Sequence, residues 1–382
     1  MIKNLSLFFL LLIILVILSC EKNSKEEPVY KPTPYTFDIP FAFPTKMNIP
    51  VNNPMTVEGV ELGRFLFYDG RLSGRTHPDS LMSCGTCHIQ ANSFEAGSNH
   101  PVFEGGFVHG LTGIQTQHVM LPLINLVWNQ SGYGWNGFLF NDNPNTNFRN
   151  LEDFVRIAVL AEDEIGGDTT KVKQLFQSID GYPELFFKSF GSSSITFKNI
   201  EKAIAQFVRS LVSANAKFDR FLKGEEQLSS SELNGFVLFT TEEGADCFHC
   251  HGGGGNPLFT THLFYNNGKD TVFTDLLDRF SITGNITDKG AYKAPTLRNI
   301  ELTGPYMHDG RFSSLDEVID FYSHHVKWSE QINPLMHHVL RGGVQLTSTQ
   351  KEDLKAFIRT LHDEGFLTNP AYSRPDKFPD EQ

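Results

Sequence analysis

Two short cysteine motifs constrain this chain more than any other feature of its sequence. The first runs from Cys84 to His88 and the second from Cys247 to His251, and each reads C-x-x-C-H. This pattern is the signature of covalent c-type haem attachment, in which both thiols bind the haem edge and the histidine is placed against the iron. The motifs use four of the five cysteines. The sequence therefore predicts two covalently bound haems, and the residues expected to hold them are Cys84, Cys87, His88, Cys247, Cys250 and His251.

Three other uses of paired cysteines remain open from the motifs alone. A thioredoxin-like C-x-x-C pair needs a βαβ context, and neither motif has one. Two C-x-x-C pairs could supply the four ligands of a structural zinc site. A disulfide framework usually marks chains far shorter than this one. None of these alternatives explains a histidine directly after both pairs, so haem attachment is the preferred interpretation.

The first nineteen residues are predicted to be a targeting segment. Lys3 gives a positive start, and the apolar run 5–18 is too short for a spanning helix but suits a signal peptide. The run ends before Cys20 in a pattern that resembles a bacterial lipoprotein cleavage box; an ordinary signal peptide with a chance cysteine is the alternative. Residues 20–40 are polar and proline-containing, which predicts a tether. We therefore expect a periplasmic protein, anchored to a membrane by a lipid on Cys20.

The length of the remaining chain predicts two domains. Residues 41–382 exceed the usual size of a single core, and each half contains one cysteine motif. A short echo supports this division, because Gly63–Phe67 precedes the first motif and Gly235–Phe239 precedes the second. We predict an N-terminal domain over residues 41–222 and a C-terminal domain over residues 223–382.

The hydrophobic periodicity is mostly helical. Helix starts are expected near Thr196, Ser229, Ser314 and Thr347; the last three open capping boxes, with Glu or Gln three residues later. Long loops rich in Gly, Pro and Asn separate the helices, and no sustained strand alternation is present. The predicted fold class is mainly α, with two cytochrome-c-like domains that each hold one covalent haem.

The composition agrees with a haem protein and excludes one class of partner. The chain contains 34 Phe, a residue that fills large apolar pockets at low conformational cost. Its formal net charge of -12 argues against binding nucleic acid.

Two longer sequence blocks carry a family resemblance. Residues 62–69 lead into the first motif, and residues 295–299 are followed by the block 303–310, which reads TGPYMHDG. From about residue 45 to 365 the chain resembles the bacterial dihaem cytochrome c peroxidases, a superfamily that includes the methylamine-utilisation dihaem enzyme. The resemblance implies that the N-terminal haem reduces hydrogen peroxide, while the C-terminal haem receives electrons from a small donor protein, a cytochrome c or a cupredoxin.

Glu164 is the candidate acid–base residue. Cleavage of peroxide needs a group that takes one proton and returns it to the leaving oxygen, and a carboxylate suits this task. The family has a Glu at a fixed spacing after a Leu-Glu pair, and here Leu151-Glu152 leads to Glu164. The alternative is a surface acid, because Glu162 and Asp163 flank it.

Trp135 is the candidate residue for electron passage between the haems. It resembles the Trp of a Trp-Asp-Gly-Arg motif in the family, but here the motif reads Trp135-Asn136-Gly137-Phe138, so both charged residues are missing. A core Trp that packs on a haem edge is the alternative.

Two residues compete as the second axial ligand of the C-terminal haem. The peroxidases of the family use Met at a position that corresponds to Tyr322 here, and the methylamine-utilisation enzyme uses Tyr. Met307 is the alternative ligand, because a thioether raises the reduction potential of a haem; a core role for Tyr322 also stays open.

The remaining family features are matched poorly. A histidine that ligates the resting peroxidatic iron in some members has only His100 and His109 as candidates. The family's calcium site uses an Asn that Val119 replaces here, although Thr303 and Pro305 could offer oxygens, so calcium stays open and unassigned.

Three functions are compatible with these residues. The first is a dihaem peroxidase that reduces hydrogen peroxide to water. The second is a peroxide-dependent oxidase of the methylamine-utilisation type, which Tyr322 favours. The third is a non-enzymatic dihaem electron carrier.

Overall fold

The computed structural model describes residues 29–381 apart from residues 99, 101–102, 139–149 and 254. The predicted targeting segment, the lipidation site Cys20 and the first part of the tether lie outside the described residues. Pro32–Gln382 forms one compact unit. Within the described part of the chain, no helix is both long enough and apolar enough to cross a membrane.

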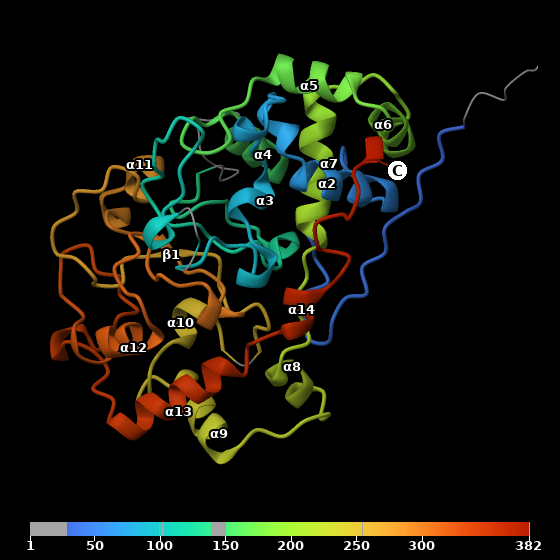
Figure 1. The fold of residues 1–382 in the computed structure, drawn as a ribbon. Helices are drawn as coiled ribbons and strands as arrows, with labels where there is room; N and C mark the ends of the chain where they lie inside the picture. Colours follow the sequence, from blue (N-terminus) through green and yellow to red (C-terminus); the bar gives the residue numbers. More distant parts are fainter. Residues whose placement is uncertain (1–28, 99, 101–102, 139–149, 254, 382) are drawn as a thin grey trace, which may run out of the picture. The chain divides into compact units, whose positions relative to one another are not determined.

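The described chain is mainly helical, which confirms that part of the predicted fold class (Figure 1). Two short strands, β1 (Phe264–Tyr265) and β2 (Tyr292–Lys293), form one antiparallel pair. Long irregular segments connect the elements. The α-helices are α2 (Val57–Tyr68), α3 (Cys84–Cys87), α4 (Leu151–Leu160), α5 (Thr169–Ser178), α6 (Tyr182–Phe190), α7 (Phe197–Ser210), α8 (Lys217–Leu222), α9 (Ser230–Phe239), α10 (Phe248–His251), α11 (Phe280–Thr283), α12 (Leu315–His324), α13 (Ser348–Arg359) and α14 (Glu364–Thr368).

The predicted capping boxes form at two of three helix starts. Ser229 and Thr347 each accept a backbone hydrogen bond from the third residue of their helix, whose side chain binds back to the cap. At Ser314 only the first of these bonds forms. The carboxylate of Glu317 binds Ser313 instead, so the predicted box at this position is wrong although the helix start is right.

The first half of the unit is organised around the crossing of α2 and α7. Gly63 of α2 lies directly against the carbonyl oxygen of Ala203 in α7, where any Cβ would collide. Leu62 and Phe207 are fully buried at this crossing. The end of α2 then lies beside α3, with the ring of Tyr68 against the backbone of the first cysteine motif.

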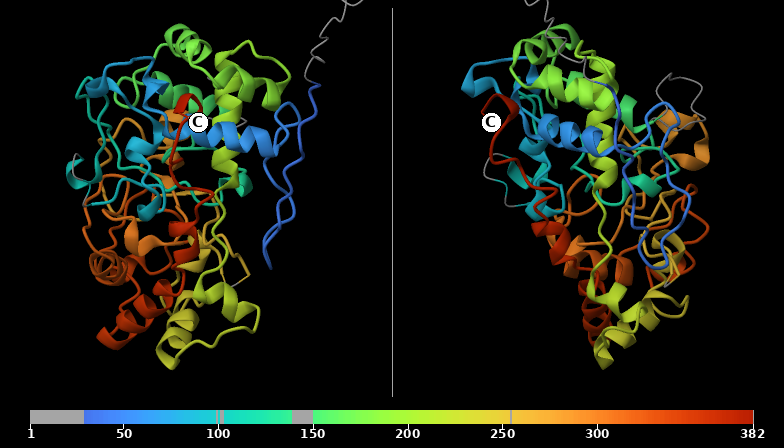
Figure 2. Two further views of the ribbon diagram at one scale, coloured as in Figure 1. Left: turned by 45° about the vertical axis from the view of Figure 1, so that its right-hand side comes forward. Right: turned by 90° about the vertical axis from the view of Figure 1, so that its right-hand side faces the viewer.

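The second half repeats this arrangement with α9 and α13. Gly235 of α9 lies against the carbonyl oxygen of Asp353 in α13, again with no room for a Cβ. Figures 1 and 2 show the two helices side by side. The echo between Gly63–Phe67 and Gly235–Phe239 therefore marks the helix crossing that precedes each cysteine motif.

Each half also contains one fully buried, bidentate ion pair. The guanidinium of Arg209 in α7 binds both carboxylate oxygens of Glu152 in α4, at 2.7 and 2.9 Å. The guanidinium of Arg298 binds both oxygens of Asp219 in α8, at 2.8 and 2.6 Å. Because all four side chains are at most 6% exposed, these pairs fix the relative positions of distant segments.

The last part of the chain packs back onto the first half. Phe366 and Phe378 belong to the same apolar cluster as α2 and α7, and Figure 2 shows this C-terminal segment beside α2. Both guanidinium nitrogens of Arg71 bind Asp380, at 2.7 and 2.9 Å. The domain boundary between residues 222 and 223 stays a prediction.

Candidate active site

The first cysteine motif forms a single helical turn, α3, that points its histidine into the protein. Ser83 caps this turn together with Thr86. The backbone nitrogen of His88 donates to the carbonyl oxygen of Cys84 at 2.9 Å and closes the turn. The Nδ1 atom of His88 lies 2.5 Å from the carbonyl oxygen of Phe94. Because a carbonyl only accepts hydrogen bonds, Nδ1 carries the proton and Nε2 keeps its lone pair for a metal.

The second motif has the same histidine geometry. Cys247–His251 forms the turn that includes α10, and Nδ1 of His251 lies 3.0 Å from the carbonyl oxygen of Pro295. Burial lowers the pKa of both His88 and His251 to about 4, so each imidazole is neutral at pH 7 and able to ligate a metal.

The surroundings of the second motif fit a haem. A cavity with about 1490 Å³ of space free of protein atoms, counted to its open mouth, has both thiols and His251 in its wall. Its other walls are largely apolar and come from several helices and loops: Phe239, Leu297, Leu315, Ile319, Leu354 and Ile358. Two thiols, an imidazole with a free nitrogen and an apolar wall are the groups that a covalent haem requires.

The first motif is likewise enclosed by aromatic side chains. Measured between ring centroids, Phe67 lies 6.3 Å from the His88 ring, 5.1 Å from Phe207 and 6.0 Å from Phe94. The thiols of Cys84 and Cys87 have pKa values raised to about 12, first by burial.

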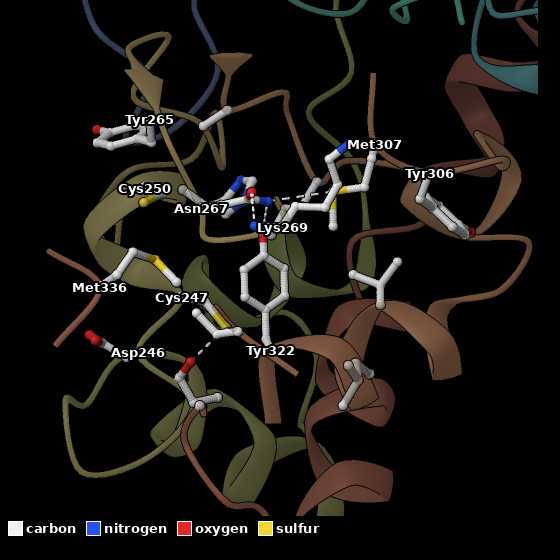
Figure 3. Close-up of a pocket in the computed structure, with 18 of the residues that line it drawn as sticks. Asp246, Cys247, Cys250, Tyr265, Asn267, Lys269, Tyr306, Met307, Tyr322 and Met336 are labelled. Atoms are coloured by element: carbon white, nitrogen blue, oxygen red, sulfur yellow. Dashed lines mark hydrogen bonds between the residues drawn. The ribbon is translucent and has the colours of Figure 1, made fainter. Parts of the chain in front are cut away.

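Both predicted axial ligands lie in the second cavity. Figure 3 shows the side chain of Asn267 close to both Tyr322 and Met307. The side-chain nitrogen of Asn267 donates to the Tyr322 hydroxyl at 2.9 Å and lies 3.6 Å from the Met307 sulfur. Met336, a second thioether in the same wall, has no counterpart in the sequence-based prediction. The choice between Tyr322 and Met307 stays a prediction.

Glu164 lies beside the first motif. It follows the end of α4 in a tight turn. Burial is the largest cause of the raised pKa values of Cys84 and Cys87, and the negative charge of Glu164 is the next largest. The carboxyl is half-buried, and its own pKa is raised to about 7, first by burial and then by the negative charge of Asp163. The neighbouring acid Glu162 is exposed. The structure thus brings the carboxyl of Glu164 to the first motif, while Asp246 lines the second cavity and also has a pKa that is raised, first by burial.

Trp135 belongs to the first half of the sequence but lines the cavity of the second motif. Its indole nitrogen donates to the carbonyl oxygen of Val119 at 2.7 Å, and its own carbonyl accepts from the backbone of Lys293 at 2.7 Å. The ring is therefore held in place beside the second motif. Its role in electron passage stays a prediction.

One buried acid near the first motif was missed by the sequence reasoning. Glu95 is fully buried, and burial raises its pKa to about 9, so the carboxyl is protonated at neutral pH. One oxygen accepts from the backbone of Gly97 at 3.1 Å, while the other has no hydrogen-bond partner among the residues that the structure describes. No sequence pattern marks Glu95, because the contact between His88 and Phe94 that places it near the first motif is seen only in the structure.

The weaker sequence candidates occupy other surroundings. His100 stacks on Phe103 at 4.3 Å, and His109 lies with its Nδ1 atom 3.1 Å from Gly110. The Val119 carbonyl accepts from Trp135, as described above, and the Thr303 hydroxyl donates to a backbone oxygen at 3.2 Å. Neither histidine is assigned as a resting-state ligand, and calcium stays open and unassigned.

Comparison with protein families and curated proteins gives a consistent match. Residues 57–227 match the family model described as di-haem cytochrome c peroxidase. The methylamine utilization protein MauG of Methylophilus methylotrophus is 30% identical, over 88% of this chain and 91% of that protein. The cytochrome c551 peroxidase of Nitrosomonas europaea is 31% identical, over 70% of this chain and 73% of that protein.

Solved structures give the same match. The crystal structure of a MauG-like protein associated with microbial copper homeostasis superposes with a TM-score of 0.76 at 31% identity, over 90% of this chain and all of that chain. The diheme peroxidase BthA from Burkholderia thailandensis shares the fold, with a TM-score of 0.67 at 16% identity over 90% of this chain.

Proposed function

The chain belongs to the di-haem cytochrome c peroxidase family, and from this membership we propose that it reduces hydrogen peroxide to water with electrons from a small redox protein. The observation that supports this function most directly is the position of Glu164. A carboxyl with a pKa near 7 lies beside one cysteine motif, where peroxide chemistry needs a proton carrier.

Two c-type haems are the cofactors of the family, and we propose the two motifs as their attachment sites. Cys84 and Cys87 would form thioethers to one haem, and Cys247 and Cys250 to the other. His88 and His251 would each ligate an iron through Nε2, because a backbone carbonyl holds Nδ1 in both rings. When bound, the haems supply the electron transfer to peroxide.

The protein's own part in peroxide cleavage is proton transfer by Glu164. Its carboxylate accepts the proton from one peroxide oxygen and returns it to the other, which leaves as water. A group with a pKa near the operating pH performs both steps, since it is neither always charged nor always protonated. The half-buried position of Glu164 limits exchange with bulk water.

The second motif is the proposed point of electron entry. Its cavity opens to solvent, and Trp135 extends into the cavity wall from the first half of the chain. We propose that the ring lies on the route that electrons take from the second motif toward the first. The proposed electron donor is a cytochrome c or a cupredoxin.

A stopped-flow experiment with matched variants tests the function. Haem-loaded protein without residues 1–20 would be mixed with hydrogen peroxide and reduced cytochrome c while donor oxidation is followed. We expect turnover by the wild type, a loss of about 10²–10⁴-fold in Glu164→Gln, and little change in Glu162→Gln. A wild-type rate in Glu164→Gln would remove its proposed role.

The same experiment separates the enzyme from an electron carrier. If no reduced donor supports turnover, and if both haems are six-coordinate and bind neither peroxide nor cyanide, the peroxidase proposal is wrong. The protein would then be a dihaem electron carrier.

A peroxide-dependent oxidase is the second candidate, and Tyr322 favours it. Its hydroxyl accepts a hydrogen bond from Asn267 in the cavity of the second motif, an arrangement that suits an oxygen ligand to iron. Two relatives at 30% identity are named methylamine utilization proteins. Peroxide consumption without oxidation of any redox protein would support this candidate over the peroxidase.

We also propose that the protein is a periplasmic lipoprotein. The segment before Cys20 supports this location, since it resembles a lipoprotein cleavage box, and c-type haems are attached outside the bacterial cytoplasm. Radiolabelled fatty acid should enter the wild-type protein and not Cys20→Ala; labelling of both or of neither would contradict the anchor.

A further inference from the structure

We propose that His118, Asp275 and His308 form a binding site for one divalent transition-metal ion, separate from both haem motifs. One ligand atom from each of these side chains lies within 4.8 Å of the other two. The three residues come from three separate loops, so no local sequence pattern predicts the site. The proposal does not depend on the peroxidase function.

Asp275 is the centre of the group. Its Oδ2 atom lies 2.6 Å from Nε2 of His118 and 3.6 Å from Nε2 of His308. The Tyr292 hydroxyl donates to the same oxygen at 2.6 Å, and the other oxygen accepts from the backbone of Leu277 at 2.8 Å. The carboxylate is thus fixed in orientation, with both imidazole nitrogens directed at one oxygen.

The two imidazoles are also held by packing. The His308 ring stacks on Tyr292 with centroids 3.5 Å apart, and the His118 ring meets both edge-on, at 5.0 and 5.8 Å. The backbone of Val119 donates to the carbonyl of His308 at 3.0 Å and joins the two histidine segments. A site with restrained ligands binds an ion at lower entropic cost than one on mobile side chains.

The charged side chains around the site nearly balance one another. Two positive side chains, Lys269 and Arg311, face the adjoining pocket, and each binds both Asp270 and Asp309 at 2.6–3.0 Å. Together with Asp275, three carboxylates face two cations, which leaves a balance of one negative charge. A polar cavity beside His118 and Asp275 gives an ion a path from solvent.

The ligand set selects the class of ion. Two imidazole nitrogens and one carboxylate suit Zn²⁺ or Cu²⁺, whereas Ca²⁺ and Mg²⁺ require mainly oxygen ligands. Tyr292 donates a hydrogen bond to the same carboxylate and orients it. Zn²⁺ is the suitable probe, because it has no redox chemistry of its own and leaves the haem spectrum readable.

Equilibrium dialysis of the haem-loaded protein tests the site. The protein would be treated with a chelator, freed of it and equilibrated with Zn²⁺ at increasing concentrations, and bound zinc would be counted against haem iron. We expect one zinc per chain. The affinity should fall at least about tenfold in Asp275→Asn and in His118→Asn, by the loss of a ligand or of the group that orients it.

A second group of side chains provides the matched control. Glu242, His249 and His337 also lie within metal-binding distance of one another, at a more exposed position. His337→Asn should leave the zinc affinity unchanged. Loss of binding in His337→Asn with retention in His118→Asn would overturn the proposal, as would a wild type that binds no zinc.

An X-ray absorption spectrum at the zinc edge adds a readout that folding defects do not imitate. We expect two imidazole nitrogens at about 2.0–2.1 Å. If Asp275→Asn fails to fold, as judged by its haem absorption and thermal midpoint, His118→Asn decides the question alone. A zinc shell without imidazole scattering would contradict the site.

Discussion

The two halves of this unit are built alike around their cysteine motifs. In each, a glycine allows two helices to cross closely before the motif, and a buried Arg forms a bidentate pair with a carboxylate. In each, a backbone carbonyl holds Nδ1 of the motif histidine. This common construction explains how both halves could present a cofactor in the same orientation.

The halves differ in the groups that surround the motif. Glu164 lies beside the first motif with a pKa near 7. The second cavity instead contains Tyr322 and Met307 together with two lysines, of which Lys293 has its pKa lowered to about 7 by burial. In the proposed function, the repeated construction would hold the cofactors, while a few side chains outside the repeat would assign proton chemistry to one half and electron entry to the other.

Removal of the motif histidines should separate the two halves most completely. His88→Ala should abolish the reaction with peroxide, because it removes the proposed iron ligand on the side of Glu164. His251→Ala should abolish donor oxidation but leave peroxide binding at the first haem, since each histidine serves one site. Stopped-flow spectra of each variant, with peroxide and with reduced donor in turn, measure this. Identical defects in both variants would contradict the division.

The pH dependence of turnover should report Glu164. Burial raises its pKa to about 7, so the carboxylate that accepts the first proton is lost as the pH falls through 7. The value of kcat/KM for peroxide should therefore fall about tenfold for each pH unit below this value and level off above it. Glu164→Gln should remove this step in the profile, whereas Glu162→Gln should retain it. A step that persists in Glu164→Gln would assign the pKa to another group.

The two buried ion pairs should contribute similar stability to their halves. Arg209→Met and Arg298→Met each leave a buried carboxylate without its partner, so we expect each to lower the free energy of unfolding by about 3–5 kcal/mol. Arg359→Met, which removes an exposed pair with Glu301, should cost about 0–1 kcal/mol. Denaturant unfolding followed by circular dichroism tests this. A loss below 1 kcal/mol in one half alone would show that the halves are not stabilised alike.

Much of this comparison follows from the sequence, because its signals are local. The two motifs, the echo at Gly63 and Gly235, and the helix starts depend on residues close together in the chain. Glu164 was found through a fixed spacing from Glu152, and that spacing has a structural basis, since Arg209 anchors Glu152 at the start of α4.

The groups that the sequence did not reveal are joined across long loops. Asn267 and Tyr322 are in contact although they lie 55 positions apart in the sequence, and His118 and Asp275 are in contact although they lie 157 positions apart. No periodicity connects such residues, because their separation is set by how irregular segments fold back. The wrong capping box at Ser314 has another cause. Two neighbouring hydroxyl groups were available to the Glu317 carboxylate, and it binds the one of Ser313.

The smallest expected effect concerns the choice of ligand in the second cavity. Asn267 donates a hydrogen bond to Tyr322, and such a donor stabilises a phenolate oxygen bound to iron better than it does a thioether. Tyr322→Phe should then alter the spectrum of the second haem and raise its reduction potential, while Met307→Leu should leave both unchanged. Potentiometric titration followed by absorbance measures each variant.

The reverse pattern would assign Met307 as the ligand, and no change in either variant would direct attention to Met336, the other thioether in the same wall. In each case the first haem should keep its spectrum, since neither residue lines its surroundings, and this independence is what the comparison of the two halves requires.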